Sequence, residues 1–347
     1  MVKKSTKNAA SASAQSPTLI DVARIAGVSP ITVSRALNRP ELVSPAAQEK
    51  VFAAVRATGY VPNMLAGGLA TRKSRLIAIF VPTIANSIFA DTVQALMDSL
   101  TAEGYQTLLG LTGYSSEREE QLLDAILGRR PDGIVLAGTL HTDESREKLR
   151  KAGIPVVEIW DLSDAPIDMQ IGFSHEQVGI EVANHLFQRG YRRFSLLTLE
   201  DARGLRRSRS VIAELASCGV HDVSIEIMPA PATLASGREG LTRILAQHGL
   251  PEVIVCSSDT IAEGVLAEAA SRGIRVPDEL AVMGFGDLSS AAQVFPALST
   301  VRVDGARIGL LVAQALLVRF NAKNQEPAPL RIDTGFSLIE RGTTKLI

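Results

Sequence analysis

The sequence predicts a small all-α domain followed by a larger α/β domain with two lobes and parallel sheets. Residues 18 to 38 hold two capped helix starts separated by a glycine. From Leu76 onward, short β-rich runs alternate with helical patterns. The chain has 347 residues, of which 46% are hydrophobic, so it is long enough for one small domain and a body with two large cores.

The first two predicted helices have clear start and stop signals. Thr18 can cap the first helix, with Asp21 three residues later completing a capping box, and Gly27 can end it. Ser29 is a favourable N-cap for the second helix, and Pro30 suits its first position, where no N–H is needed. Apolar faces are assigned to Val22, Ile25 and Ala26 in the first helix and to Val33 and Leu37 in the second.

The opposite face of the second predicted helix is polar and cationic. Thr32, Ser34 and Arg35 lie there, and such side chains can bond phosphates or base edges in a major groove. Ile31 can cover a thymine methyl group. The alternative is an ordinary helical hairpin, because helix-Gly-helix segments are common in all-helical domains.

A third helix is predicted to follow these two. Ser44 and Pro45 can open it in the same way, and Gly59 can close it. Its apolar side is assigned to Val51, Phe52 and Val55. Three short helices favour a compact bundle over an isolated hairpin.

This N-terminal segment resembles the lac repressor family of bacterial transcription regulators, which typically begins D-V-A-x-x-A-G-V-S-x-x-T-V-S-R-x-L-N. The positions that match are Asp21, Val22, Ala23, Ala26 to Ser29, Thr32 to Arg35, Leu37 and Asn38. The family's G-Y-x-P-N appears as Gly59, Tyr60, Pro62 and Asn63, and its A-x-x-L as Ala66 and Leu69.

The resemblance implies a DNA-binding domain at residues 18–63, a hinge at 64–74 and an effector-binding and dimerisation domain at 75–347. We expect residues 1–17 to be a disordered basic tail. The resemblance also implies that Leu69 wedges between base pairs in the minor groove, and Gly67 and Gly68 mean that DNA must drive folding of the hinge. The residues expected to contact DNA are Ser29, Pro30, Ile31, Thr32, Ser34, Arg35, Asn38, Asn63 and Leu69.

Charge is divided unevenly along the chain. The net charge is −1, yet residues 1 to 75 hold eleven Lys and Arg and three acidic residues, which leaves −9 for the remainder. A basic N-terminal part supplies the salt-dependent attraction to phosphates expected of a DNA-binding domain, whereas an acidic body is repelled by the duplex. Solvated charge alone explains either half but rarely their segregation.

Several other classes of protein are disfavoured. Cys218 and Cys256 lie in different segments, which indicates reduced thiols, and no metal-ligand spacing or cofactor motif is present. No run approaches the ~18 apolar residues of a membrane helix, and residues 1–17 lack the apolar core of a signal peptide. We expect a cytoplasmic protein without metal, cofactor or membrane contact. A periplasmic sugar receptor, the nearest rival, needs a signal peptide and does not need residues 18–63.

Enzymatic motifs are also missing. The sequence contains no G-x-S-x-G elbow, no H-E-x-x-H and no Walker sequence. Residues 68–74 only superficially suggest a phosphate loop, because Arg72 stands where the glycine before Lys73 is required. We expect no enzymatic activity.

The remainder of the chain has the pattern of a βαβ series. Several helices are expected to end at a glycine that leads into the next strand, as at Gly104, Gly153, Gly190, Gly219 and Gly273. Parallel sheets follow, because each crossover needs a helix. Strands are predicted at Leu76–Val81, Thr107–Leu111, Gly133–Leu136, Val156–Trp160, Phe194–Leu199, Val253–Cys256 and Leu280–Phe285. The family resemblance extends through this region and implies a periplasmic-binding-protein-like body with three crossovers between the lobes and an effector between them.

Ligands in this architecture bind beyond the carboxyl ends of the strands. After the first strand, Asn86 and Phe89 can offer a hydrogen bond and a flat surface, although an N-cap and a core Phe are the alternative. After the fourth strand, Trp160 and Asp161 can stack on a sugar and bond it, and strand alternation places Glu158 and Trp160 on the same side. The alternative there is a Trp at a lobe boundary beside solvated acids.

The resemblance adds further candidates in the second lobe. Asp259 stands at the family's N-D position, whose carboxylate accepts bonds from ligand hydroxyls, and it is also a natural N-cap. Arg207 and Arg209 are the two candidates for the family's ligand-binding Arg, because the usual R-x-x-G-[FY] has become Arg209-Ser-Val-Ile-Ala and the register is open. A solvated charge run is the alternative. His175 is expected to be a polar residue at a helix start.

Within the family, the chain is similar to gluconate and ketogluconate regulators. The segments that carry this similarity are residues 61–70 (V-P-N-M-L-A-G-G-L-A), 158–161 (E-I-W-D) and 171–175 (I-G-F-S-H). It implies a sugar-acid effector, with an Arg for the carboxylate and Asp259 for the hydroxyls. We therefore expect a ligand-responsive repressor that acts as a homodimer, or a tetramer, on a palindromic operator. A regulator of a neutral sugar is the alternative.

Overall fold

The computed structural model describes residues 17–61, 73–84, 87–322 and 329–344. The chain divides into two compact units, Met1–Arg72 and Lys73–Ile347. The described part of the first unit is helical, and that of the second contains two sheets with helices on both faces. The predicted combination of a helix-turn-helix domain and a two-lobed α/β body is confirmed.

The first unit consists of short helices around one apolar core. Its described helices are α1 (Leu19–Ala26), α2 (Pro30–Asn38), the single-turn η1 (Pro40–Leu42) and α3 (Pro45–Thr58). The predicted capping box of Thr18 and Asp21 is present, and Gly27 has the positive φ of 65° expected at a helix C-cap. The core residues are Val22, Ala23, Ala26, Val33, Ala36, Val51 and Ala54.

Two residues assigned to this core from the sequence are exposed instead. Ile25 is 53% exposed and Phe52 is 38% exposed. The buried faces are centred on Val22, Ala23 and Ala26 in α1 and on Val51 and Ala54 in α3. Ile25 and Phe52 lie roughly 100° or more away from those centres around the helix axis. Valines and small alanines, rather than Ile25 and Phe52, therefore form the contacts between the helices.

The second unit contains one sheet in each lobe. The first sheet has β1 (Leu76–Val81), β2 (Gln106–Leu111), β3 (Gly133–Ala137), β4 (Val156–Ile159), β5 (Met169–Gly172) and β11 (Leu330–Asp333), in the spatial order β11-β5-β4-β3-β1-β2. The second has β6 (Phe194–Leu199), β7 (Val223–Met228), β8 (Val253–Cys256), β9 (Ala281–Gly286), β10 (Ser299–Arg302) and β12 (Ser337–Ile339), in the order β12-β10-β9-β8-β6-β7.

The strand pairs are parallel, as predicted, with one exception. β12 pairs with β10 in the antiparallel direction. The reason is topological, because β12 follows β11 through a short connection from the other lobe and enters the second sheet from the opposite end. The seven predicted strands are present within a residue or two, whereas β5, β7, β10, β11 and β12 were not predicted.

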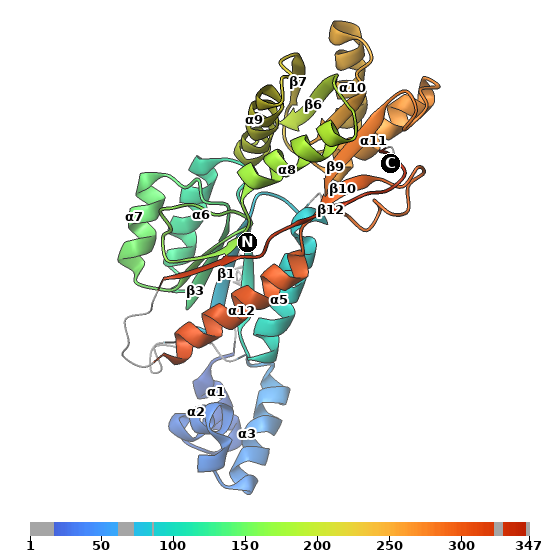
Figure 1. Cartoon of the computed structure of the whole chain (residues 1–347). Helices are drawn as coiled ribbons and strands as arrows, with labels where there is room; N and C mark the ends of the chain where they lie inside the picture. The colour runs from blue at the N-terminus through green and yellow to red at the C-terminus, as the bar shows by residue number, and fades with distance from the viewer. Residues whose placement is uncertain (1–16, 62–72, 85–86, 323–328, 345–347) are drawn as a thin grey trace, which may run out of the picture. The chain divides into compact units, whose positions relative to one another are not determined.

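Helices cover both faces of each sheet (Figure 1). In the first lobe, α5 and α12 pack together on one face and α6 and α7 cover the other. In the second lobe, α8 pairs with α9 and α10 with α11. These helices are α5 (Ala90–Ala102), α6 (Ser116–Leu127), α7 (Asp143–Ala152), α8 (His175–Gln188), α9 (Ala202–Ser217), α10 (Leu234–His248), α11 (Asp259–Ser271) and α12 (Gly305–Asn321), with the single-turn η2 (Ser87–Phe89) before α5.

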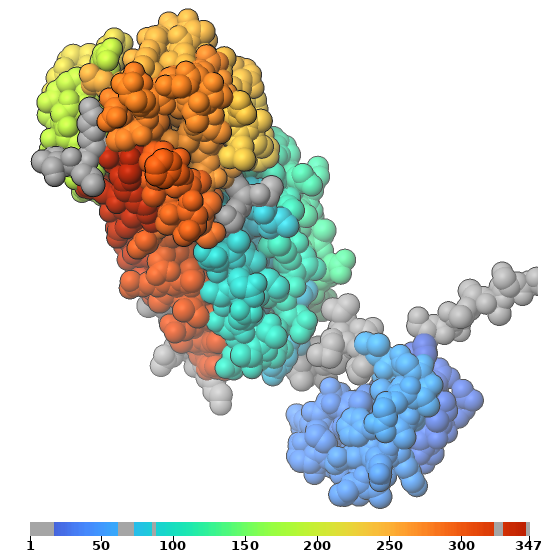
Figure 2. Space-filling view, turned by 90° about the vertical axis from the view of Figure 1, so that its right-hand side faces the viewer, coloured from blue at the N-terminus to red at the C-terminus, as the bar shows by residue number. Residues whose placement is uncertain are grey.

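The chain passes between the lobes three times, as the resemblance implied. It enters the second lobe between β5 and α8, returns to the first between β10 and α12, and leaves again between β11 and β12. The C-terminal segments therefore contribute to both lobes, with α12 and β11 in the first and β12 in the second, as the orange and red segments of Figure 2 show. Within the described residues, no helix is long and apolar enough to cross a membrane.

Candidate DNA-binding helix and inter-lobe pocket

One face of α2 is exposed and chemically suited to reading base edges. Ile31 is 64% exposed, and Arg35 and Asn38 are exposed as well. Among the described residues, the guanidinium of Arg35 has no ion pair or hydrogen bond. A free guanidinium beside an exposed apolar side chain matches a guanine and a neighbouring thymine methyl.

Other candidates on α2 are partly occupied by the helix itself. Ser29 Oγ accepts a hydrogen bond from Thr32 N at 3.2 Å and lies 2.9 Å from Thr32 Oγ1. Asn38 Nδ2 donates to Ser34 O at 2.9 Å. Ser29 is therefore the N-cap first, while Pro30 is exposed at the first helical position and Ser34 is half-buried. Asn63 and Leu69 lie outside the described residues, so their DNA contacts stay predictions.

In the second unit, two adjoining cavities lie between the lobes at the carboxyl ends of the strands. We call them the aromatic cavity, about 40 Å³, and the hydroxyl cavity, about 130 Å³. They share Tyr114, Asp201 and Arg203. The remaining lining residues of the aromatic cavity are Ile88, Phe89, Trp160, His175, Leu199, Arg207, Ser257, Ser258 and Phe285.

The position of both cavities follows from the strand order. β1 lies between β2 and β3, and β6 lies between β7 and β8, so each sheet has a point where successive connections leave in opposite directions. A crevice opens outside the carboxyl ends of the strands at such a point.

Phe89 and Trp160 line the aromatic cavity but show little surface to it. Each is 3% exposed, their ring centroids are 5.2 Å apart, and the guanidinium of Arg203 lies 5.3 Å from the Phe89 ring centroid. Trp160 Nε1 donates to Thr92 Oγ1 at 2.9 Å. These rings form an apolar wall and are not open surfaces on which a sugar could stack.

Strand alternation predicted that Trp160 and Glu158 lie on the same side of the sheet, and this prediction is wrong. β4 ends at Ile159, and Trp160 has a positive φ of 64°, which breaks the alternation. Trp160 packs against Phe89 and Phe173, whereas Glu158 lies on the α7 side near His141 and Arg146.

Arg207 is held in place at the aromatic cavity by three contacts. Its Nη1 lies 2.9 Å from His175 Nδ1, its Nη2 donates to Ser257 O at 2.9 Å, and its guanidinium carbon lies 3.8 Å from the centroid of the Phe285 ring. Burial lowers the pKa of Arg207 to about 10, against the opposing charge of Asp201, so the group remains positive at neutral pH.

His175 is a positioning residue for Arg207, a role that the sequence did not reveal. Its Nε2 lies 3.0 Å from Trp160 O, which can only accept, so Nε2 carries the proton and Nδ1 accepts from Arg207. Burial, together with the charges of Arg207, Arg203 and Arg206, holds the pKa of His175 well below its usual range. A neutral His175 can accept from Arg207, whereas a protonated one could not.

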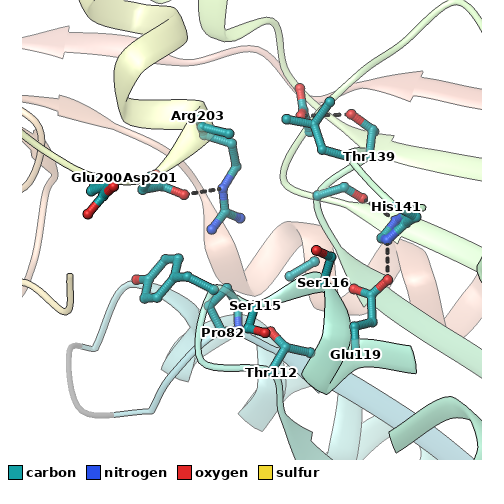
Figure 3. Close-up of a pocket in the computed structure, with 16 residues that line it drawn as sticks. Pro82, Thr112, Ser115, Ser116, Glu119, Thr139, His141, Glu200, Asp201 and Arg203 are labelled. Atoms are coloured by element: carbon teal, nitrogen blue, oxygen red, sulfur yellow. Dashed lines mark hydrogen bonds and ion pairs between the residues drawn. The ribbon is translucent and has the colours of Figure 1, made fainter. Parts of the chain in front are cut away.

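Arg203 is a second cation of the site, and it lines both cavities. Its side chain is 11% exposed, its Nε lies 3.5 Å from Asp201 Oδ1, and Figure 3 shows its terminal nitrogens turned into the cavity. Burial raises the pKa of Asp201, but Arg203 and Arg207 outweigh that effect and the pKa is lowered. Arg203 was not among the arginines predicted from the sequence, which were Arg207 and Arg209.

Asp161 connects the two lobes. It follows β4 in the first lobe, lines the hydroxyl cavity, and accepts a hydrogen bond from Arg206 Nη1 of α9 at 3.0 Å. Thr139 Oγ1 and Leu162 N also donate to its carboxylate. Burial raises the pKa of Asp161, and Arg206 acts in the opposite direction. Its oxygens thus accept hydrogen bonds from the protein itself. Asp161 is therefore a structural part of the cavity wall.

The hydroxyl cavity also has a paired acid and histidine on its first-lobe wall (Figure 3). Glu119 Oε1 lies 2.7 Å from His141 Nδ1. Behind His141, Glu158 is fully buried, and burial raises its pKa. The remaining lining residues are Pro82, Thr112, Ser115, Ser116, Ala137, Gly138, Thr139, Leu140, Glu200 and Ala202.

Two predicted effector residues lie away from these cavities. Arg209 is exposed on α9 and lines neither cavity, because two residues along a helix turn a side chain roughly 200° from Arg207. Asp259 is fully buried, its oxygens accept from Thr300 Oγ1 at 2.5 Å and Leu288 N at 2.7 Å, and Ser258, not Asp259, caps α11. Asn86 lies outside the described residues.

Comparison with known proteins agrees with both units. Residues 18–63 match the family described as bacterial regulatory proteins, lacI family, and residues 183–344 match a periplasmic binding protein-like domain. The HTH-type transcriptional regulator GntR of Pseudomonas aeruginosa is 36% identical over 330 residues, which cover 94% of this chain and 96% of that protein. The chain belongs to the LacI family. It is a DNA-binding transcription regulator.

Further LacI-family relatives cover nearly the whole chain. The HTH-type transcriptional regulator GntR of Escherichia coli K12 is 30% identical over 328 residues, or 94% of this chain and 98% of that protein. A LacI-family regulator structure from Silicibacter pomeroyi has a TM-score of 0.88 at 32% identity and covers 94% of this chain and 99% of that one. The lac repressor dimer bound to operator and the anti-inducer ONPF has a TM-score of 0.79 at 25% identity and covers 95% and 99%.

Proposed function

We propose that this LacI-family regulator represses sugar-acid genes as a cytoplasmic homodimer on a palindromic operator, without enzymatic activity of its own. A sugar acid of the gluconate or ketogluconate type is the proposed effector. The observation that supports this proposal is the pair Arg203 and Arg207, which both line a pocket between the lobes with an aromatic wall.

The charge of the pocket favours an acid over a neutral sugar. Arg207 is anchored by neutral groups, namely His175, Ser257 O and the Phe285 ring, so its charge is only partly balanced by Asp201. A ligand carboxylate can form charge-assisted hydrogen bonds with such a guanidinium, whereas an aldose offers only neutral oxygens. Asp259 has no part in this proposal, because its oxygens are already bonded inside the second lobe.

Calorimetric titration tests the effector class. Gluconate and 2-ketogluconate should bind, and glucose should not, because the partly buried cations lose their partner with a neutral ligand. Heat from glucose and from neither acid would reject a sugar-acid effector in favour of a neutral-sugar regulator. The DNA-binding assignment would be unaffected.

Two variants on the same helix locate the carboxylate. Arg207→Ala should weaken gluconate binding by about 2–5 kcal/mol, the usual effect of removing one partner of a desolvated charge pair. Arg209→Ala removes the same charge from an exposed position two residues away and should leave the affinity unchanged. Equal losses in the two variants would show that overall charge, not pairing at Arg207, governs binding.

A further inference from the structure

The wall of the hydroxyl cavity opposite Arg203 carries an unused hydrogen-bond acceptor. Glu119 lies in the first turn of α6, and its side chain is 12% exposed. Its Oε1 is 2.7 Å from His141 Nδ1, while Oε2 makes no hydrogen bond within the described part of the chain. Figure 3 shows Glu119 and Arg203 on opposite sides of the same cavity.

His141 fixes the direction of Glu119. The Nε2 of His141 faces Gly138 O at 3.1 Å and Glu158 Oε1 at 3.7 Å, and its side chain is only 2% exposed. A carbonyl oxygen can only accept, so Nε2 carries a proton. The contact between Nδ1 and Glu119 then holds a second proton, either on the ring or on the carboxyl group. In both arrangements the second oxygen of Glu119 is left as an acceptor toward the cavity.

The buried Glu158 makes this arrangement rigid. It is fully buried, and its Oε1 has no hydrogen-bond partner in the described residues. Oε1 lies 3.7 Å from His141 Nε2 and 3.9 Å from Arg146 Nη2. A displaced His141 would remove one of the two N–H donor groups that face this buried oxygen, which is costly in a low-dielectric interior. Glu119 is therefore a preorganised acceptor and not a mobile surface acid.

We propose that Glu119 is a specificity-determining residue, which accepts a hydrogen bond from a hydroxyl group at the far end of a polyhydroxy acid whose carboxylate is bound by Arg203 and Arg207. This inference rests on the proposed function, and it adds a requirement for ligand length. A short hydroxy acid can satisfy the arginines but cannot reach Glu119. A neutral hydroxyl suits the carboxyl group at this position, whereas a second anionic group would meet like charge.

The test combines ligand length with a substitution at Glu119. Dissociation constants of aldonic acids with six, five, four and three carbons are measured calorimetrically on the full chain and on Glu119→Ala. For the wild type, affinity should rise by about ten-fold or more at the length that first reaches Glu119, the usual effect of a hydrogen bond to a charged group. In Glu119→Ala that rise should vanish, with unchanged affinity for the three-carbon acid.

Two further variants keep the result interpretable. Glu119→Gln preserves packing against His141 and should show a reduced rise, which covers the case in which the alanine variant fails to fold. Glu120→Gln is the matched control, because Glu120 is the next acid on α6, accepts a hydrogen bond from Thr142 Oγ1 and does not line the cavity. It should behave as wild type.

The outcomes separate this inference from the proposed function. An equal loss of affinity for all four acids in the Glu119 variants, or no loss for any of them, would overturn the role of Glu119 while leaving a sugar-acid effector in place. Absence of binding of every acid to the wild type would overturn both.

Discussion

At the scale of single residues, Asp259 is a carboxyl group that is bonded inside the protein and does not face a ligand cavity. It is fully buried beside Gly284, and its oxygens accept from Thr300 and Leu288. Burial raises its pKa to about 6, with the hydrogen bond from Thr300 acting in the opposite direction. At neutral pH the folded protein thus contains a buried, ionised Asp259, whose charge is less stable there than in the unfolded chain.

The pH dependence of stability should reveal this carboxylate. Between about pH 4 and pH 6 the folded state holds a proton that the unfolded chain has released, so the contribution of Asp259 to stability falls as pH rises through that range. In Asp259→Asn this titration is absent, and the Thr300 hydroxyl can turn to accept from the amide. Relative to the variant, the wild type should lose about 1–1.5 kcal/mol of unfolding free energy between pH 5 and pH 7.5.

Urea denaturation of both proteins at the two pH values measures the difference. The neutral His175 contributes with the opposite sign, but it is present in both proteins and cancels. A difference between wild type and variant that does not change with pH would show that Asp259 has an ordinary pKa.

A site residue could be predicted from the sequence where its position depends on a nearby feature, such as a helix cap. Arg207 follows a capped helix start by a fixed number of residues, so it could be selected together with Arg209, but only the helical rotation in the fold separates the two. His175 and Glu119 owe their roles to Trp160, Arg207 and His141, which are distant in sequence. No local pattern encodes such pairs.

At the scale of elements, α2 exposes Ile31 and Arg35, two side chains that do not pack in the core of the first unit. Arg35→Ala should cost roughly 1–3 kcal/mol of operator binding and relax specificity at one base pair, because an Arg that bonds guanine discriminates between bases. Fluorescence anisotropy with operator and with base-substituted duplexes measures both quantities.

Arg24→Ala is a suitable comparison for Arg35→Ala. Arg24 lies on α1, is exposed, and pairs with Asp21. Its loss should change specific and non-specific binding alike, through the general attraction to phosphates. Unaltered operator affinity of a folded Arg35→Ala protein would remove Arg35 from the base-reading face.

Elements with capping residues were predicted well, and short or edge strands were missed. Thr18, Ser29 and Gly27 act within a few residues of themselves, so their effect is visible in sequence. By contrast, β5, β11 and β12 have three or four residues each and exist because distant segments supply their partners, as in the pairing of Leu330 with Met169. Alternation also failed at Trp160, where a positive φ ends β4.

At the scale of the whole second unit, the ion pair between Arg206 and Asp161 connects the lobes. Asp161 is fully buried and the Arg206 side chain is 20% exposed. Arg206→Gln leaves Asp161 with Thr139 and Leu162 as its donors, so we expect a loss of about 1–3 kcal/mol of unfolding free energy, below the value for a fully buried pair. The effect of gluconate on operator affinity should change as well.

Glu176→Gln separates an inter-lobe effect from a general loss of charge. Glu176 also pairs with Arg206, at 3.4 Å, but it is half exposed and lies in the same lobe on α8. Operator affinity with and without gluconate, measured for both variants, should differ from wild type only in Arg206→Gln. By linkage, gluconate affinity with and without operator must change by the same factor. Identical behaviour of the two variants would exclude Arg206 and Asp161 as a connection between the sites.

The second crossing, which returns the chain to the first lobe, has a consequence for synthesis on the ribosome. α12 packs on α5 and β11 pairs with β5, although 215 residues separate the starts of the two helices and 161 separate Leu330 from its partner Met169. A nascent chain therefore exposes the apolar side of α5, with Leu96 and Leu100, until its last segments emerge. The lobe that begins first is completed only after most of the second lobe has been made, so a product that ends before α12 leaves its earliest-made lobe incomplete and open to association.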